Sequence, residues 1–168
     1  QPEAACRRGQ GIKTLSGKAM DRLAERGAQL SSQEAVRFVP ASGAASRMFK
    51  ALASGNREAV SQFDARWDAF PFRSAAESSG PCDTIEERLE AIMERLALPA
   101  QPKGGLPVHM YGLVARTAFE EHMHEWKATL PHAESPKVHF TLPDSGREHW
   151  AQRLEQWADD LGVEVTTS

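Results

Sequence analysis

The segment 36–52, which reads VRFVPASGAASRMFKAL, constrains the fold of this chain more than any other. It begins with an apolar run of β-branched and aromatic residues that stops at Pro40. Only small residues follow over positions 41–46, and apolar side chains then recur at a spacing of three to four from Met48. This order predicts a strand, a tight loop and a helix that begins near Ser46.

The predicted loop lies at the N-terminus of the predicted helix, where a phosphate group could bind. The first turn of a helix has unpaired backbone N–H groups and the positive end of the helix dipole, and both attract anions. We expect the loop to bind a phosphorylated ligand through residues whose small side chains leave the backbone open: Ala41, Ser42, Gly43, Ala44, Ala45 and Ser46. The alternative is a plain tight connection with Arg47 in a surface ion pair.

Two common nucleotide-binding signatures do not match this loop. A Walker A loop requires GxxxxGK[ST], and a dinucleotide-binding fingerprint requires GxGxxG. The residues after Val39 follow neither pattern. We therefore set aside the P-loop and dinucleotide-binding classes.

Periodicity along the rest of the chain predicts alternating helices and strands. Apolar side chains at helical spacing predict helices at 16–30, 56–68, 83–96, 111–127 and 150–161. We expect the first of these to cover the sheet or a neighbouring element. Runs of β-branched and aromatic residues predict further strands at 137–142 and 162–168. The alternation favours a single α/β domain with a mostly parallel sheet between two helical layers, and 53–98 as a helical insertion.

Local signals refine these predictions. Asp83, followed by Glu86 three residues on, indicates a capping box at the start of a helix. Residues 74–81 are rich in Ser, Ala, Gly and Pro and predict a loop or mobile flap. Residues 101–109 are too rich in Pro and Gly for a helix or a central strand. We therefore expect an exposed loop that carries Lys103.

Composition narrows the classes of partner that the chain can bind and the cellular compartment in which we expect it. The chain has 20 Lys and Arg and 23 Asp and Glu, interspersed along 168 residues, for a formal net charge of −3. No basic patch typical of nucleic-acid binders is visible, and no apolar run approaches the ~20 residues that a membrane helix needs. Cys6 and Cys82 lie far apart without a CxxC pair, which indicates free thiols. We therefore expect a cytoplasmic protein with neither a nucleic-acid nor a membrane partner.

Three further groups of polar residues are candidates for a site. His109 and Tyr111 either contact a substrate or have a structural role at a junction between a loop and a helix. Asp144 directly follows a predicted strand and is a candidate ligand for a metal ion or a ribose hydroxyl. The stretch 120–125, EEHMHE, contains metal-ligand residue types but lacks HExxH spacing, so we interpret it as a solvated charged face.

Two motifs resemble those of a known enzyme family. The string ASGAASRM resembles the AAGxGxRM or GGxGTRL loop of the nucleotidyltransferases that make nucleotide-sugars, and Pro102-Lys103-Gly104 resembles their PKG element. The whole chain is also similar to a bacterial family that resembles sugar-nucleotide pyrophosphorylases in its N-terminal part. Members of that family carry nearly the same FVPASGAASRMFK, PKG, HxY and HFT strings.

This resemblance implies a function. It implies a partial nucleotidyltransferase-like, Rossmann-like fold whose loop at 41–46 cradles a nucleoside triphosphate or a nucleotide-sugar. Arg47 would hold the β- and γ-phosphates, and Lys103 would neutralise charge on the phosphoryl group that is transferred to a phosphorylated sugar. Mg²⁺ that bridges the phosphates is the expected cofactor. The alternative is a non-catalytic phosphate- or nucleotide-binding or assembly module, because Ala44 and Ala45 stand where the enzymes prefer Gly or Thr.

The same resemblance places the metal-binding aspartates beyond further strands that follow this sequence. The chain begins at Gln1 and ends on a predicted strand with no helix after it. We therefore expect it to be a fragment of a longer protein.

Overall fold

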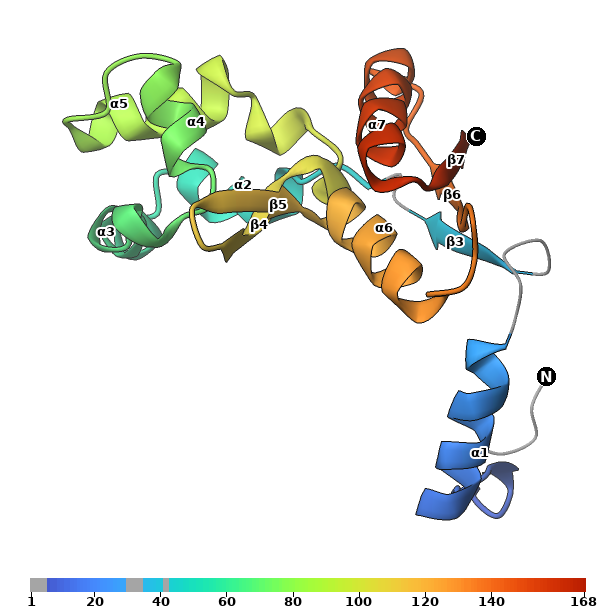
Figure 1. Ribbon diagram of the computed structural model, residues 1–168. Helices are drawn as coiled ribbons and strands as arrows, with labels where there is room; N and C mark the ends of the chain where they lie inside the picture. Colours follow the sequence, from blue (N-terminus) through green and yellow to red (C-terminus); the bar gives the residue numbers. More distant parts are fainter. Residues whose placement is uncertain (1–5, 30–34, 41–42) are drawn as a thin grey trace.

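The computed structural model describes residues 6–29, 35–40 and 43–168 (Figure 1). Its elements up to residue 105 are β1 (Arg7–Arg8), β2 (Gly11–Ile12), α1 (Gly17–Ala28), β3 (Val36–Pro40), α2 (Ser46–Ala53), α3 (Arg57–Ala65), the 3₁₀ helix η2 (Trp67–Ala69), α4 (Arg73–Ser78), α5 (Ile85–Glu90), the π-helical segment η3 (Ala91–Arg95), and the 3₁₀ helices η4 (Leu98–Ala100) and η5 (Lys103–Gly105). They are followed by β4 (Pro107–Tyr111), β5 (Val114–Thr117), α6 (Ala118–Thr129), β6 (Lys137–Thr141), α7 (Arg147–Leu161) and β7 (Glu164–Thr167). The structure confirms an α/β protein, with β3 and α2 on either side of the predicted loop.

Strands β3, β6 and β7 form a parallel sheet with β6 in the centre. Val39 lies beside Phe140, and Phe140 lies beside Thr167 on the other side. The pairing confirms the predicted strands and their parallel direction. Because the carboxyl ends of parallel strands meet at one edge of the sheet, the segments that follow β3 and β6 begin at the same edge.

Helices α6 and α7 pack on one face of this sheet (Figure 1). The core between them consists of Val39, Phe119, Met123, Val138, Phe140, Leu142, Trp150, Leu154, Ala158 and Val163. The ring of Phe119 contacts Phe140 and Trp150 edge-on, with centroids 5.1 and 5.7 Å apart. On the opposite face, Val36 and Phe38 are 57% and 62% exposed. Helical cover on both faces, as predicted for three layers, is therefore not confirmed.

The helices that lie between the loop and Lys103 have a core of their own. Figure 1 shows α2, α3, α4 and α5 gathered at the end of the molecule that lies away from the sheet. Their core consists of Ala45, Phe49, Phe63, Trp67, Phe72, Ala76, Cys82, Ala91, Ile92, Leu98 and Leu106. The stretch 53–98 is helical, as predicted, and it folds together with α2.

Residues 107–117 form an antiparallel hairpin where the sequence predicted a loop and the start of a helix. Tyr111 pairs with Val114 across a two-residue turn, and Gly112 in that turn has φ +65°. Glycine is favoured in this conformation because it has no Cβ. The predicted helix over 111–127 is therefore wrong in its first part, since α6 begins at Ala118.

The predicted exposed loop over 101–109 is wrong as well. Pro102, Gly105 and Leu106 are buried, and β4 already begins at Pro107. Lys103 itself is exposed. The segment is thus an ordered, half-buried connection that presents a lysine, because its apolar residues belong to the protein interior.

Two glycines allow this connection to lie against aromatic rings. A Cβ atom on Gly104 would clash with the ring of Phe119, and a Cβ atom on Gly105 would clash with the ring of Trp150. Both rings belong to the core of the sheet. The backbone beside Lys103 is therefore packed on two buried aromatic side chains.

The Ser- and Ala-rich stretch predicted as a loop or flap over 74–81 contains a helix. Helix α4 covers most of it, with Phe72 and Ala76 buried in the helical core. The prediction of a loop or mobile flap is therefore wrong. Alanine has the highest helix propensity, and burial of Phe72 and Ala76 in the helical core stabilises the helix further.

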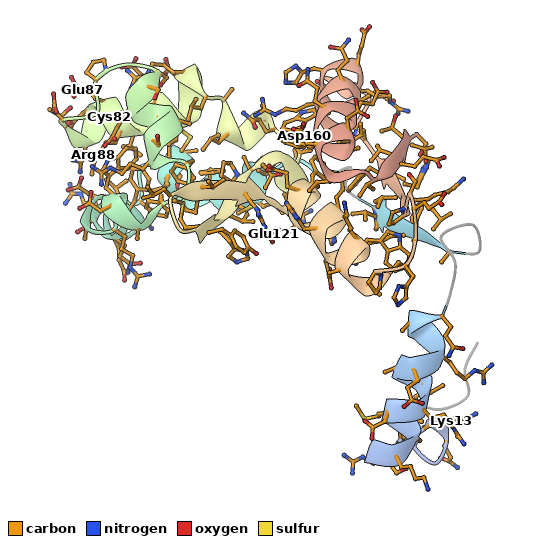
Figure 2. The ribbon with its side chains drawn as sticks, viewed as in Figure 1. Lys13, Cys82, Glu87, Arg88, Glu121 and Asp160 are labelled. Carbon is orange, nitrogen blue, oxygen red and sulfur yellow. The ribbon has the colours of Figure 1, made fainter. Side chains whose placement is uncertain are left out.

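The capping box of α5 lies one residue later than predicted. The side chain of Thr84 accepts a hydrogen bond from Glu87 N at 3.3 Å, and the Glu87 carboxylate accepts one from Thr84 N at 2.9 Å. Figure 2 labels Glu87 at this end of the helical part. Asp83 and Glu86 have the same spacing, but the threonine hydroxyl is the group that forms the box.

Helix α1 lies apart from the other described elements (Figure 1). Ser16 is its N-cap residue, and the Ser16 hydroxyl accepts a hydrogen bond from Ala19 N at 3.3 Å. No residue of α1 is buried, and Met20 and Leu23 are 57% and 48% exposed. The helix is confirmed, but the expectation that it covers the sheet or a neighbouring element is wrong.

The structure also bears on the membrane and cysteine predictions. Over the described ranges, no helix has the length and apolar character required to cross a membrane. Cys6 is exposed, Cys82 is buried, and both are free thiols as predicted.

Replacement of Gly105 by alanine should destabilise the fold. The added methyl group would clash with the buried ring of Trp150, and overpacking of this kind costs about 1–3 kcal/mol. Chemical denaturation of Gly105→Ala measures the loss. Gly43→Ala is the matched control, because a Cβ atom there meets nothing within 4 Å. Equal stability of Gly105→Ala and the wild type would contradict the prediction.

Candidate functional site

Backbone hydrogen bonds join the loop after β3 to the segment 101–103. Ala45 N donates to Gln101 O at 2.9 Å, and Lys103 N donates to Gly43 O at 3.0 Å. An isolated antiparallel bridge lies between these two bonds. The small-residue loop and the Pro-Lys-Gly element are therefore direct neighbours in space. In the sequence, only the resemblance to nucleotidyltransferases had linked these two motifs.

A pocket of about 320 Å³ opens where these segments meet. Its described lining consists of Val39, Pro40, Gly43, Lys103, Gly104, Ala118, Phe119 and His122. Because Val39 and Pro40 end strand β3, the pocket lies at the carboxyl edge of the parallel sheet, where open α/β sheets bind ligands. Small backbone-exposing residues and one lysine line it, which suits an anionic ligand.

Among the described residues that we expected to contact phosphate, Gly43 and Lys103 line this pocket, whereas Ala44, Ala45, Ser46 and Arg47 do not. Ser46 and Arg47 are exposed in the first turn of α2, whereas Lys103 is exposed and lines the pocket. Within the described ranges neither the Arg47 side chain nor the Lys103 side chain has a hydrogen-bond or ion-pair partner, so the alternative of an Arg47 surface ion pair gains no support there. Ala41 and Ser42, also predicted to contact phosphate, lie outside the described residues.

The described part of the loop has ordinary backbone angles. Ala45 has φ −78° and ψ 0°, and neither Gly43 nor Ala44 has a positive φ. The two alanines therefore cause no backbone strain where the enzymes prefer glycine or threonine. Ala45 provides no side-chain cap for α2, which leaves N–H groups of the first turn for another partner.

The structure places His109 and Tyr111 on strand β4, away from the pocket lining. Nδ1 of His109 lies 2.7 Å from Oε1 of Glu121, and the Tyr111 hydroxyl donates to the same oxygen at 3.2 Å. Figure 2 shows Glu121 where α6 meets the hairpin. Desolvation, and then the bond to Glu121, raise the pKa of Tyr111. The predicted junction of loop and helix is wrong, and the two side chains hold the hairpin against α6.

Asp144 follows β6, as the sequence predicted, but it does not line the pocket. Its carboxylate accepts a hydrogen bond at 2.6 Å from Nη2 of Arg147, which is the first residue of α7. The side chain is almost fully exposed. The ion pair therefore occupies one oxygen of this carboxylate at the surface.

His122 is a pocket residue that the sequence analysis missed. Nη2 of Arg37 lies 3.1 Å from Nδ1 of His122 and donates to Oε2 of Glu125 at 2.5 Å. Burial, and then the charge of Arg37, lower the pKa of His122. Arg37 and His122 are 85 positions apart, so no local pattern could have revealed this contact. The stretch 120–125 is accordingly not a purely solvated face.

The remaining carboxylates of that stretch have structural partners. Glu120 forms a capping box with Thr117, Glu121 bonds to the hairpin, and Glu125 pairs with Arg37. Over residues 6–29, 35–40 and 43–168, no group of three or more His, Cys, Asp and Glu side chains could hold a metal ion. Among the described residues that line the pocket there is no carboxylate.

These features define an α/β protein with a pocket at the carboxyl edge of a parallel sheet, formed by a small-residue loop and a lysine segment. Over residues 1–168 the chain matches the family described as a domain of unknown function, DUF4301, and it belongs to that family. No curated protein and no solved structure matches the chain.

Stability should fall as the pH drops below about 6.5, the ordinary pKa of histidine. Burial lowers the pKa of both His122 and His124 in the folded chain, so the unfolded chain binds protons first as the solution becomes acidic. The stabilisation is fully present above pH 6.5, and it is lost as the pH falls through the lowered pKa values that these histidines have in the folded chain. Urea unfolding between about pH 7.5 and pH 5 measures this loss.

The double variant His122→Asn and His124→Gln is the control for this pH dependence. It removes both groups whose pKa is lowered, so the free energy of unfolding should fall less steeply with acidification. A slope equal to that of the wild type would contradict the assignment.

Proposed function

We propose that this chain binds the phosphates of a nucleoside triphosphate or a nucleotide-sugar in the pocket lined by Gly43 and Lys103. The observation that carries the proposal is the backbone pairing of the loop after β3 with the segment 101–103. This pairing sets exposed backbone, a lysine and the end of a parallel strand around one pocket. The first turn of α2 adds an uncapped helix N-terminus beside it.

The reaction that we propose is nucleotidyl transfer to a sugar phosphate. A phosphate oxygen of the sugar phosphate attacks the α-phosphorus, the bond between that phosphorus and the β-phosphate oxygen breaks, and pyrophosphate leaves with the electron pair. Such a displacement needs charge-matched positioning more than it needs a base. Lys103 would supply a point charge at the pocket, and Arg47 would supply a forked donor in the adjacent turn of α2.

The expected Mg²⁺ remains a prediction. Protein-bound Mg²⁺ usually has one or two carboxylate ligands together with substrate phosphates. The described residues of the pocket lining supply none, so they do not fit a metal ion held by the protein itself. The chemistry assigned above to Lys103 and Arg47 concerns these side chains alone.

A second candidate function is a non-catalytic phosphate- or nucleotide-binding module. The pocket lining favours it in one respect, because its described residues include one side chain with a permanent charge, Lys103, and no carboxylate. Asp144, the carboxylate that the sequence offered, is paired with Arg147 instead. Such a module would bind phosphates without transferring them.

The proposed fold goes further than the described sheet. We propose that β3, β6 and β7 belong to a Rossmann-like, nucleotidyltransferase-like sheet with helices on both faces. The parallel strand order supports this arrangement. So do Val36 and Phe38, which form an exposed apolar surface on the face opposite to α6 and α7.

The proposed setting is cytoplasmic, with small phosphorylated molecules as the partners. The free thiols of Cys6 and Cys82 agree with a reducing compartment. The absence of a basic excess in the composition argues against a nucleic-acid partner.

Removal of either cation should weaken nucleotide binding. Arg47→Ala and Lys103→Ala should each reduce the affinity for a nucleoside triphosphate by about 1.5 to 3 kcal/mol, the usual range for hydrogen bonds to charged groups. Calorimetric titration with each common triphosphate, with and without Mg²⁺, measures the change. Lys13→Ala is the matched control, because Lys13 is exposed beside α1, far from the pocket (Figure 2). Unchanged affinity in both test variants would remove the site assignment.

Pyrophosphate exchange separates the two candidate functions. A transferase should incorporate labelled pyrophosphate into a nucleoside triphosphate when a nucleotide-sugar and Mg²⁺ are present. Lys103→Ala should reduce the exchange rate by at least the factor by which it reduces affinity. Measurable nucleotide affinity without exchange for any common nucleotide-sugar would favour the binding module.

A further inference from the structure

Among the described residues that line the pocket, Lys103 and His122 have the side chains that can hydrogen-bond to a ligand. The other lining residues are apolar or glycine. His122 is partly buried in α6, on the side of the helix that also contacts β3. Its ring therefore forms part of the wall of the pocket and part of the contact between the helix and the sheet.

The contact with Arg37 fixes which ring nitrogen of His122 carries the proton. A guanidinium can only donate, so Nδ1, 3.1 Å from Nη2 of Arg37, must accept. The neutral ring then has its proton on Nε2. Arg37 is itself held by the ion pair with Glu125, and its guanidinium lies 6.0 Å from the centroid of the Trp126 ring. The protonation pattern of His122 is thus built into the fold.

We propose that His122 binds the phosphate group of the ligand by donating a hydrogen bond from Nε2, beside the ammonium group of Lys103, with Arg37 and Glu125 as positioning residues. This inference rests on the function proposed above and adds a binding residue to it. A ring whose Nδ1 is occupied offers the pocket a donor and no acceptor, and lysine likewise only donates. The pair therefore favours an acceptor-rich group, such as a phosphoryl oxygen, over a group that can only donate, such as an ammonium group.

Burial and the neighbouring charges together favour the neutral ring of His122. Burial is the largest cause of its lowered pKa, the charge of Arg37 on β3 lowers the pKa further, and Glu125 and Glu121 on α6 raise it. Lys103 lines the same pocket. The donor on Nε2 is therefore present at neutral pH without a positive charge on the ring.

Two substitutions distinguish the two ring nitrogens. His122→Asn keeps an acceptor near the position of Nδ1 for Arg37 but removes the donor at Nε2. His122→Gln reaches the position of Nε2 with an amide donor and gives up the contact with Arg37. A merely structural role of His122 predicts the opposite order, with Gln the more damaging change.

Calorimetric titration of the full chain with inorganic pyrophosphate at neutral pH is the first test. His122→Asn should bind pyrophosphate about tenfold more weakly than the wild type, and His122→Gln within about threefold of it. His124→Asn and His124→Gln are the matched controls on the same helix, because His124 does not line the pocket. They should bind as the wild type does.

The outcomes separate this inference from the function on which it rests. If Lys103→Ala loses affinity while His122→Asn binds normally, the role of His122 is refuted and the phosphate site stands. If the wild type binds neither pyrophosphate nor any common nucleoside triphosphate, the proposed function fails and this inference fails with it.

Nitrogen NMR of the histidine rings provides a test that requires no variant to fold. In the wild type at neutral pH, His122 should show an unprotonated Nδ1 and a protonated Nε2, and the Nε2 signal should shift when pyrophosphate is added. A proton on Nδ1 of His122, or an Nε2 signal that ignores saturating pyrophosphate, would overturn the proposal.

Discussion

The backbone hydrogen bonds between the loop after β3 and the segment 101–103 determine how the rest of the molecule is arranged. They place Lys103 directly beside Gly43 in the pocket lining, although the helical part of the chain lies between them in sequence. They also position Ala45, which is fully buried in the helical core. Since each bond joins main-chain atoms, the arrangement depends on the path of the backbone more than on particular side chains.

The pocket lies where two separate cores meet. Val39, on one side of the loop, packs into the core of the sheet, and Ala45 and Phe49, on the other side, pack into the helical core. The segment with Lys103 repeats this pattern, because Gly104 and Gly105 lie against rings of the sheet core while Leu106 packs into the helical core. Changes in either core are therefore expected to reach the pocket wall.

The sequence predicted those parts of the fold that local patterns determine. Runs of β-branched and aromatic residues located the strands of the parallel sheet, and helical spacing located α2, α3 and α7. It missed the hairpin, although Gly112 between two β-branched runs was a usable turn signal. It missed α4, because the Ser, Gly and Pro residues of 74–81 outweighed the high helix propensity of alanine in that prediction, and no local pattern reveals that Ala76 packs in the helical core. In the candidate site, the motifs identified Gly43 and Lys103, whereas the place of His122 depends on Arg37, far away in sequence.

Helix α6 connects the hairpin with strand β3 of the parallel sheet. Glu121 binds the hairpin, while His122 and Glu125 bind the strand side through Arg37. A rotation of this helix about its own axis would break both sets of contacts at once. The direction in which the hairpin projects and the position of the imidazole in the pocket are therefore mechanically coupled, and neither can change while the other stays in place.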